Sequence, residues 1–297
     1  MAHRFCDVQG EAVGHDPVAL RANLSWLRAN NFRVVPLAEL LDRLTEGAPV
    51  ERMLAFTIDD GYADFARVAA PIFAEFECPV TVFLTTAFID GHHWMWWDRV
   101  KFACSALRRE TETGAMIESL KSLTESERME RISSLLRDAG LELPATPSPK
   151  YAPLSWDDVR RLARSGVTFG PHSVTHPMLA RTSPEQSRFE IAESWRRVRE
   201  EVGDAAIPVF CYPNGGEDDF GIREQDIIAA EGMRGALATR VGFASHRDFA
   251  GDHPTARFRL PRFGYPDDRL EFIQIVSGIE RIAEAVRVAT QPFRRRD

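Results

Sequence analysis

MLAFTIDDG, at residues 53–61, gives the clearest indication of the fold. Its first six residues form a short apolar run typical of buried strands, and Asp59, Asp60 and Gly61 follow at once. On both sides, strand-like runs alternate with segments whose apolar residues recur at helical spacing. Strands are predicted at 32–37, 53–58, 79–85, 167–170, 208–212, 235–239 and 258–262, and helices at about 17–30, 37–44, 64–76, 155–165, 184–202, 222–231 and 268–289.

This alternation predicts an α/β protein with βαβ units and a mainly parallel sheet. With a further strand at Ala2 to Phe5, the chain has about eight strands, enough to close a barrel. Residues 99–140 break the rhythm because they are helical without strands, and 141–153 contain several prolines. We therefore expect one domain over residues 1–297 with a helical insertion at about 99–153, which either overhangs the site or only decorates the barrel.

Composition and charge exclude several classes of protein. The chain of 297 residues has a formal net charge of −7, which argues against an electrostatic nucleic-acid binder and a polybasic membrane anchor. The first twenty residues lack a signal-peptide pattern, and the longest apolar stretch, Cys78 to Ile89, is too short to cross a membrane. The four cysteines lie far apart, so neither a disulfide scaffold nor a cysteine-based zinc site is expected. We predict a soluble, cytoplasmic protein without membrane insertion.

Two adjacent carboxylates, Asp59 and Asp60, follow the strand at 53–58, where α/β proteins gather functional groups. They repel each other unless a cation or a shared proton relieves the repulsion. A solvated Asp-Gly turn is the alternative interpretation of this pair.

Two histidines, His172 and His176, follow the predicted strand at 167–170. At a spacing of four residues they would face the same side of one helical turn, so both rings can reach one metal ion. Two unrelated surface histidines are the alternative. With one carboxylate of the aspartate pair they form a three-ligand site with open positions, which suits a catalytic divalent metal. The other aspartate would remain free as a base.

Three motifs resemble those of the polysaccharide deacetylases, the family with the NodB homology domain (carbohydrate esterase family four). TIDDG at 57–61 resembles the family's T-F-D-D-G, and HSVTH at 172–176 matches its H-[S/T]-x-x-H. FCYPNG at 210–215 resembles the F-x-Y-P-x-G form of its third motif. The resemblance runs from about residue 3 to about residue 275.

The resemblance implies a distorted (β/α) barrel of about seven to eight mainly parallel strands with a metal ion at its mouth. The metal ligands would be Asp60, His172 and His176, and Asp59 would be the general base. The cofactor would be one divalent metal ion, with zinc as the first choice and cobalt, nickel, manganese or iron as alternatives.

The third motif implies that Tyr212 stabilises an oxyanion through its backbone N–H and that Tyr212 and Pro213 contact the substrate. It lacks the arginine of the family's R-x-P-Y form, which would orient the base. Arg262, at the end of the last predicted strand, could supply that charge from elsewhere.

The general acid is a second departure, because residues 268–297 contain no histidine for the family's C-terminal L-x-H motif. AHRF at residues 2–5 resembles the Y-H-R-V-like setting of circularly permuted members, which makes His3 the candidate acid. An incidental histidine near the terminus is the alternative, and His246 and His253 are the reserve candidates.

Tryptophans follow the strand at 79–85, and an aromatic face suits the C–H face of a sugar ring. Trp96 and Trp97 are therefore predicted substrate contacts, together with Trp94 as a third candidate. Packing as core beneath the loop is the alternative.

The expected function is a metal-dependent hydrolase that removes an N-acetyl group from an amino sugar or saccharide, with no nucleic-acid partner. Alternatives are hydrolysis of another C–N bond, as in a cyclic amide, hydrolysis of an O-acetyl ester, or a catalytically silent carbohydrate-binding module. A 2-His-1-carboxylate iron oxygenase shares the ligand types, but its usual jelly-roll setting does not fit alternating strands and helices.

Overall fold

The computed structural model describes residues 1–7, 13–91, 93–250 and 255–279. Its helices are α1 (Pro17–Ala29), α2 (Leu37–Glu46), α3 (Ala70–Glu75), α4 (Thr86–Ile89), α5 (Trp96–Ala106), α6 (Thr113–Lys121), α7 (Glu125–Asp138), α8 (Trp156–Arg164), α9 (Pro184–Val202), α10 (Ile222–Ala230) and α11 (Arg269–Ser277). Its strands are β1 (Arg33–Val34), β2 (Met53–Leu54), β3 (Phe56–Ile58), β4 (Val80–Leu84), β5 (Thr168–Pro171), β6 (Val209–Cys211) and β7 (Gly235–Leu237). Within these ranges no helix combines the length and the apolar character needed to span a membrane.

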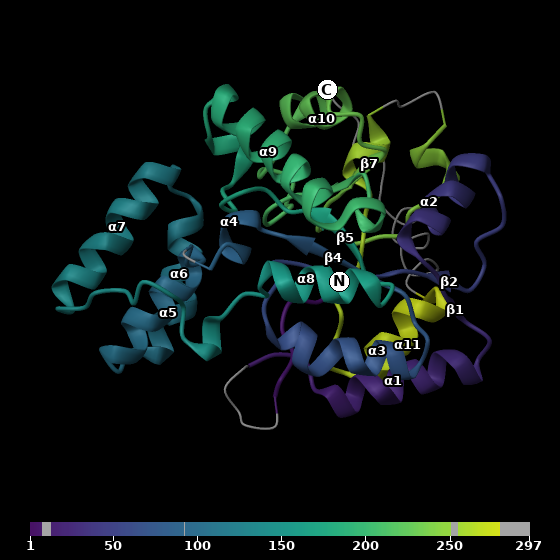
Figure 1. Ribbon diagram of the computed structural model, residues 1–297, viewed down its shortest axis with the longest axis horizontal. Helices are drawn as coiled ribbons and strands as arrows, with labels where there is room; N and C mark the ends of the chain where they lie inside the picture. Colours follow the sequence, from purple (N-terminus) through teal and green to yellow (C-terminus); the bar gives the residue numbers. More distant parts are fainter. Residues whose placement is uncertain (8–12, 92, 251–254, 280–297) are drawn as a thin grey trace, which may run out of the picture.

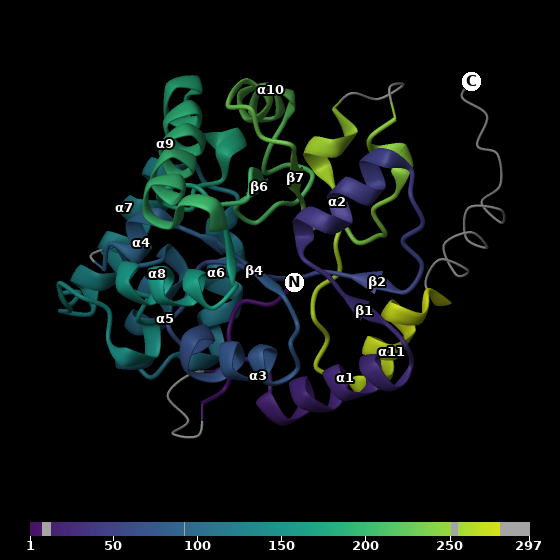
Figure 2. The same ribbon diagram turned by 45° about the vertical axis from the view of Figure 1, so that its right-hand side comes forward.

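The fold is mixed α/β, and its strand ladders are parallel, as the alternating pattern predicts. The described strands form three small sheets, with the orders β1-β2, β3-β4-β5 and β6-β7. In Figures 1 and 2 helices lie on both sides of these strands, with α9 and α10 on one side and α1, α3 and α11 on the other. Parallel sheets are usually covered on both faces in this way.

Strand β4 lies at the centre of the three-stranded sheet, and all five of its residues are buried. Ile58 of β3 pairs with Val82, and Gly170 of β5 pairs with Phe83. A Cβ atom at Gly170 would lie 2.4 Å from the Phe83 ring, so only glycine fits at this close approach. The ends of β3 and β5 are thereby held at the same edge of the sheet.

Backbone hydrogen bonds also join segments that lie outside the strand ladders. They are Ala2 N to Thr57 O (3.0 Å), Ile207 N to Phe169 O (2.8 Å), Leu260 N to Ala236 O (2.8 Å) and Tyr265 N to Met1 O (2.6 Å). The predicted strand at 258–262 is replaced by a 3-10 turn, Ala256–Arg259, and one bridge at Leu260. Pro261 follows that bridge and has no N–H with which to extend a ladder.

Helices α5, α6 and α7 form a group at one side of the molecule, on the left in Figure 1. They occupy the segment that the sequence predicts to be helical without strands. Their apolar residues pack into a small core of their own, to which Met178 contributes from outside the group. The core consists of Trp96, Val100, Ala103, Cys104, Leu120, Ile132, Leu136 and Met178.

Candidate functional site

Asp60, His172 and His176 come together where β3 and β5 end, as the sequence predicts for groups at the carboxyl edge of a parallel sheet. The Oδ1 atom of Asp60 lies 3.5 Å from His172 Nε2 and 3.6 Å from His176 Nε2. All three side chains are buried. Three potential ligand atoms therefore surround one point.

The donor atoms at this point fit a metal ion. Asp60 Oδ1 is buried and has no hydrogen-bond partner among the described residues, which is costly for a carboxylate oxygen unless a cation binds it. His172 Nδ1 lies 2.7 Å from the Cys211 carbonyl oxygen, which only accepts, so Nδ1 carries a proton and Nε2, which faces Asp60, is the ring nitrogen that would ligate a metal. Despite burial, the neighbouring Cys211 and Asp60 raise the pKa of His172, so a metal ion would displace the Nε2 proton. Burial and the neighbouring His172 ring lower the pKa of His176 to about 3, so this ring is neutral and able to ligate.

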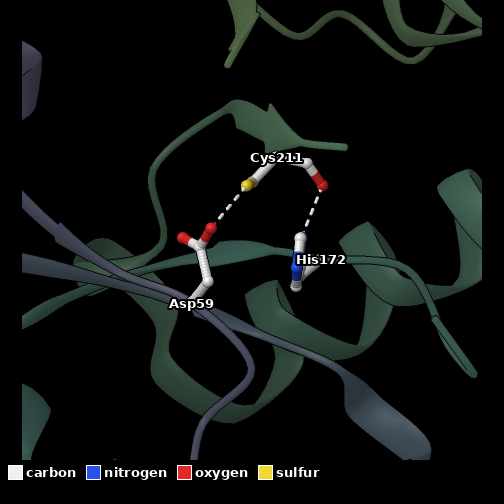
Figure 3. Close-up of side chains that lie close together, drawn as sticks. All are labelled: Asp59, His172 and Cys211. Carbon is white, nitrogen blue, oxygen red and sulfur yellow. Dashed lines mark hydrogen bonds between the residues drawn. The ribbon is translucent and has the colours of Figure 1, made fainter. Parts of the chain in front are cut away.

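Figure 3 shows a second cluster, in which Asp59 and Cys211 lie beside His172. The Cys211 thiol donates to Asp59 Oδ2 over 3.5 Å, and these side chains could also be considered as metal ligands. Arg262 Nη2, however, lies 3.0 Å from Cys211 Sγ. A guanidinium cation at this distance disfavours a second cation, so the Asp60 group suits a metal ion better than this cluster does.

Asp59 makes a bidentate ion pair with Arg262. This is the residue predicted from the sequence to replace the arginine that the third motif lacks. Arg262 Nη1 donates to Asp59 Oδ1 over 2.9 Å and Nη2 donates to Oδ2 over 2.6 Å. Burial alone would raise the pKa of Asp59, but the guanidinium holds it well below the usual carboxyl range. Asp59 is therefore an ionised carboxylate that is fixed in orientation.

The turn after β3 separates the two aspartates by means of an unusual backbone conformation. Asp60 has a φ of 73°, in the left-handed region that residues with a Cβ atom rarely adopt. Ser173 and His176 have φ values of 66° and 61°, so residues 172–176 form a loop and not the helical turn expected from the histidine spacing. Such strain gathers at functional sites and persists only where the surrounding structure holds it.

His3 reaches the site because the N-terminal segment pairs with β3. The Ala2 carbonyl accepts from Asp59 N over 2.9 Å, and His3 Nε2 lies 3.9 Å from Asp59 Oδ2. The His3 side chain is 45% exposed and lines the cavity, so it can approach a substrate. Of the reserve candidates, His246 Nδ1 is bonded to the Leu44 carbonyl and does not line this cavity, and His253 lies outside the described residues.

Tyr212 lies in the site, but its polar groups are already engaged. The backbone N–H donates to the Leu237 carbonyl over 3.2 Å, and the hydroxyl donates to the Phe258 carbonyl over 2.9 Å. The predicted oxyanion donor is therefore not free in this conformation, because β6 uses it to pair with β7. Pro213, a predicted substrate contact, is buried and is not among the cavity-lining residues.

The tryptophans after β4 divide between the cavity and the core. Trp97 is partly buried, its ring edge packs against His176 with 4.7 Å between centroids, and its Nε1 donates to the Tyr62 hydroxyl. Trp96 also borders the cavity but is only 4% exposed, under the Arg128 guanidinium. Trp94 is buried, and its Nε1 donates to the Pro144 carbonyl.

A cavity of about 290 Å³ joins these groups. Several of its lining residues come from distant segments and belong to no motif, so the sequence alone does not reveal them. The lining residues are His3, Arg4, Asp59, Asp60, Tyr62, Trp96, Trp97, Lys101, Ile117, Lys121, His172, His176, Tyr212, Asn214 and Thr239.

Comparisons with known proteins identify the family to which the chain is similar. A family model described as polysaccharide deacetylase matches residues 46–225. Poly-beta-1,6-N-acetyl-D-glucosamine N-deacetylase of Escherichia coli K12 is 36% identical over 62 residues, which is 20% of this chain and only 9% of the length of that relative.

Solved structures share the fold over nearly the whole chain. The deacetylase PplD of Streptococcus pyogenes, solved with acetate, has a TM-score of 0.61 at 16% identity and covers 92% of this chain and 95% of its own. IcaB of Ammonifex degensii has a TM-score of 0.58 at 16% identity, and the match covers 93% of each chain. At this level of identity the likeness concerns the fold alone.

Proposed function

Because the chain belongs to the polysaccharide deacetylase family, we propose that it is a metal-dependent hydrolase that removes an N-acetyl group from an amino sugar or saccharide. Family membership supports deacetylase activity on acetylated carbohydrates. The observation that carries the metal dependence is the convergence of Asp60, His172 and His176 beside a separate, ionised Asp59. Two imidazole nitrogens and one carboxylate oxygen suit zinc with an open position for water.

The proposed mechanism assigns a separate task to each polar residue. A bound divalent metal would supply an acidified water and polarise the acetyl carbonyl. Asp59 accepts the proton of that water as its oxygen attacks the carbonyl carbon, while Arg262 keeps the carboxylate ionised and aimed. His3 donates a proton to the sugar nitrogen as the C–N bond breaks. Acetate and a free amine are the products.

Three finer features of the chain are part of the same proposal. Backbone hydrogen bonds between neighbouring segments support a distorted barrel in one domain. They join Ala2 to β3, Ile207, just before β6, to β5, Leu260 to β7, and Tyr265 to Met1. The helical segment at about 99–153 would then be an insertion that lines one side of the cavity with Lys101, Ile117 and Lys121. Trp97 is the proposed sugar contact, and the cytoplasmic location stays a prediction.

Removal of the metal tests the proposed function. Treatment with a chelator is expected to lower acetate release by more than about 100-fold, because both the acidified water and the carbonyl polarisation are lost. Addition of zinc should restore the rate. Acetate is measured after incubation with N-acetylglucosamine oligomers, nucleotide sugars and O-acetylated esters, which also separates amide from ester hydrolysis. Full activity in a protein shown to be metal-free would contradict the proposal.

Replacement of His3 tests the assignment of the general acid. His3→Gln is expected to lower kcat for acetamide hydrolysis by about 100-fold, the range of a lost general acid. Hydrolysis of an aryl acetate, whose leaving group needs no proton, should change little. His246→Gln is the matched control and should leave both rates unchanged. Equal losses on the two substrates would show that His3 does not protonate the leaving group.

A further inference from the structure

We propose that Glu190 of α9 is a positioning residue that holds the loop Ser173–His176 in the conformation that presents His176 to the metal. Glu190 belongs to none of the three sequence motifs of the site. This inference rests on the proposed function, because it takes His176 of this loop to be a metal ligand.

The Glu190 carboxylate accepts hydrogen bonds from both central residues of this loop. Oε2 accepts from Val174 N over 2.7 Å and from Thr175 N over 2.8 Å. Oε1 accepts from Thr175 Oγ1 over 2.7 Å and from Gln186 Nε2 over 3.0 Å. Two consecutive backbone N–H groups and a hydroxyl of the loop therefore converge on one carboxylate.

Burial of the Glu190 carboxylate costs free energy, which its hydrogen bonds to the loop offset. The side chain is fully buried, and it forms no ion pair with a Lys, Arg or His side chain in the described parts of the chain. A buried carboxylate is strongly disfavoured unless it is paired or fully hydrogen-bonded. Here the loop N–H groups, not a basic side chain, replace the water that Glu190 loses.

The loop Ser173–His176 also contains strained backbone, which needs support from its surroundings. Ser173 and His176, on either side of the two residues that Glu190 binds, have positive φ values. Helix α4 also holds the loop, because Ala87 N donates to the Val174 carbonyl over 2.9 Å. With Glu190 removed, the two backbone N–H groups would lose their buried acceptor and the strained turn would be free to relax. His176 would then leave the position it shares with Asp60.

The test measures zinc affinity by competition with a chromophoric chelator, with circular dichroism to verify folding. Glu190→Leu removes all four acceptor contacts and is expected to weaken zinc binding by about 10- to 100-fold, as for other residues that orient metal ligands. Glu190→Gln keeps an oxygen that can accept from both backbone N–H groups, so it should recover most of the affinity.

Two variants on α9 serve as controls. Glu193→Leu changes a partly exposed carboxylate that pairs with Arg196 and should bind zinc as the wild type does. Ser194→Ala removes a buried hydroxyl that donates to the Glu190 backbone carbonyl, so it disturbs the helix without touching the loop. If Ser194→Ala weakens zinc binding as much as Glu190→Leu, general destabilisation explains the effect and the inference is overturned.

The outcomes separate this inference from the proposed function. Failure of the wild-type protein to bind zinc contradicts the metal-dependent function itself. Wild-type affinity in a folded Glu190→Leu overturns only the positioning role. If Glu190→Leu does not fold, Thr175→Val decides, because it deletes one loop donor and keeps the side-chain shape. We expect Thr175→Val to bind zinc about five-fold more weakly, and unchanged affinity would overturn the inference.

Discussion

Asp59→Asn is expected to lower kcat for acetate release by about 10²- to 10⁴-fold while the protein keeps its bound metal. The amide cannot accept the water proton, and a general base contributes a factor of this size. Metal binding should persist because the side chain of Asp59 faces Arg262, whereas Asp60 faces the two histidines. Metal content by atomic emission and acetate release are measured on the same sample.

His172→Ala is the matched comparison, because it removes a ligand instead of the base. Its metal affinity should fall by more than about 100-fold, and acetate release should be lost with it. Replacing residues that only orient a metal ligand already lowers metal affinity by about 10- to 100-fold. If both variants lose metal equally, the division of labour between Asp59 and the ligand set is wrong.

Arg262→Met is expected to destabilise the protein by about 3–5 kcal/mol, the effect of leaving one partner of a buried ion pair alone. The Arg262 side chain is 9% exposed and that of Asp59 is 2% exposed, so water cannot replace the lost cation. Acetate release should also fall, because the carboxylate loses the two hydrogen bonds that orient it. Urea unfolding measures the free energy, and Arg196→Met, at an exposed site on α9, is the control.

The pH dependence of this destabilisation follows from the direction of the pKa shift. Arg262 lowers the folded-state pKa of Asp59, so the pair stabilises the protein above the unfolded carboxyl pKa of about 3.9 and loses this effect as the pH falls below it. The stability difference between Arg262→Met and the wild type should therefore be largest near neutral pH and shrink toward pH 3. A difference that stays constant with pH would contradict the ion-pair account.

A double variant tests whether the destabilisation arises from the unpaired carboxylate. Arg262→Met combined with Asp59→Asn removes both charges, so it should lose less free energy of unfolding than the sum of the two single changes. Simple additivity would mean that Arg262 stabilises the protein through its bonds to Thr57 and Ala238 instead.

The sequence predicts much of this fold because its signals are local. The apolar run before Asp59 and the spacing of His172 and His176 are visible in short windows, and both lie at strand ends as expected. The predicted strand at 258–262 was wrong in its detail, because Pro261 limits pairing to one bridge. The oxyanion role of Tyr212 could not be judged from sequence, since it depends on whether Leu237 of another strand occupies its N–H.

Other features of the site depend on contacts between segments that are far apart in the sequence, and no short stretch of sequence reveals such contacts. Arg262 is recognisable as a charge near the last strand, but its bidentate geometry with Asp59 arises only when segments about 200 residues apart meet. The Cys211 carbonyl that orients the His172 ring is a backbone group, so the residue type at this position does not reveal the contact. Glu190 looks like an ordinary helical glutamate until its buried contacts with Val174 and Thr175 are seen.

Zinc-edge anomalous diffraction from zinc-loaded crystals tests most directly the claim that Asp60, His172 and His176 hold the metal. We predict one peak at about 2.0–2.2 Å from a carboxylate oxygen of Asp60 and from the Nε2 atoms of both histidines. Arg262 should remain paired with Asp59, outside the coordination shell. A peak bound by Asp59 and Cys211, or no ordered peak near Asp60 in protein that binds zinc in solution, would contradict the account.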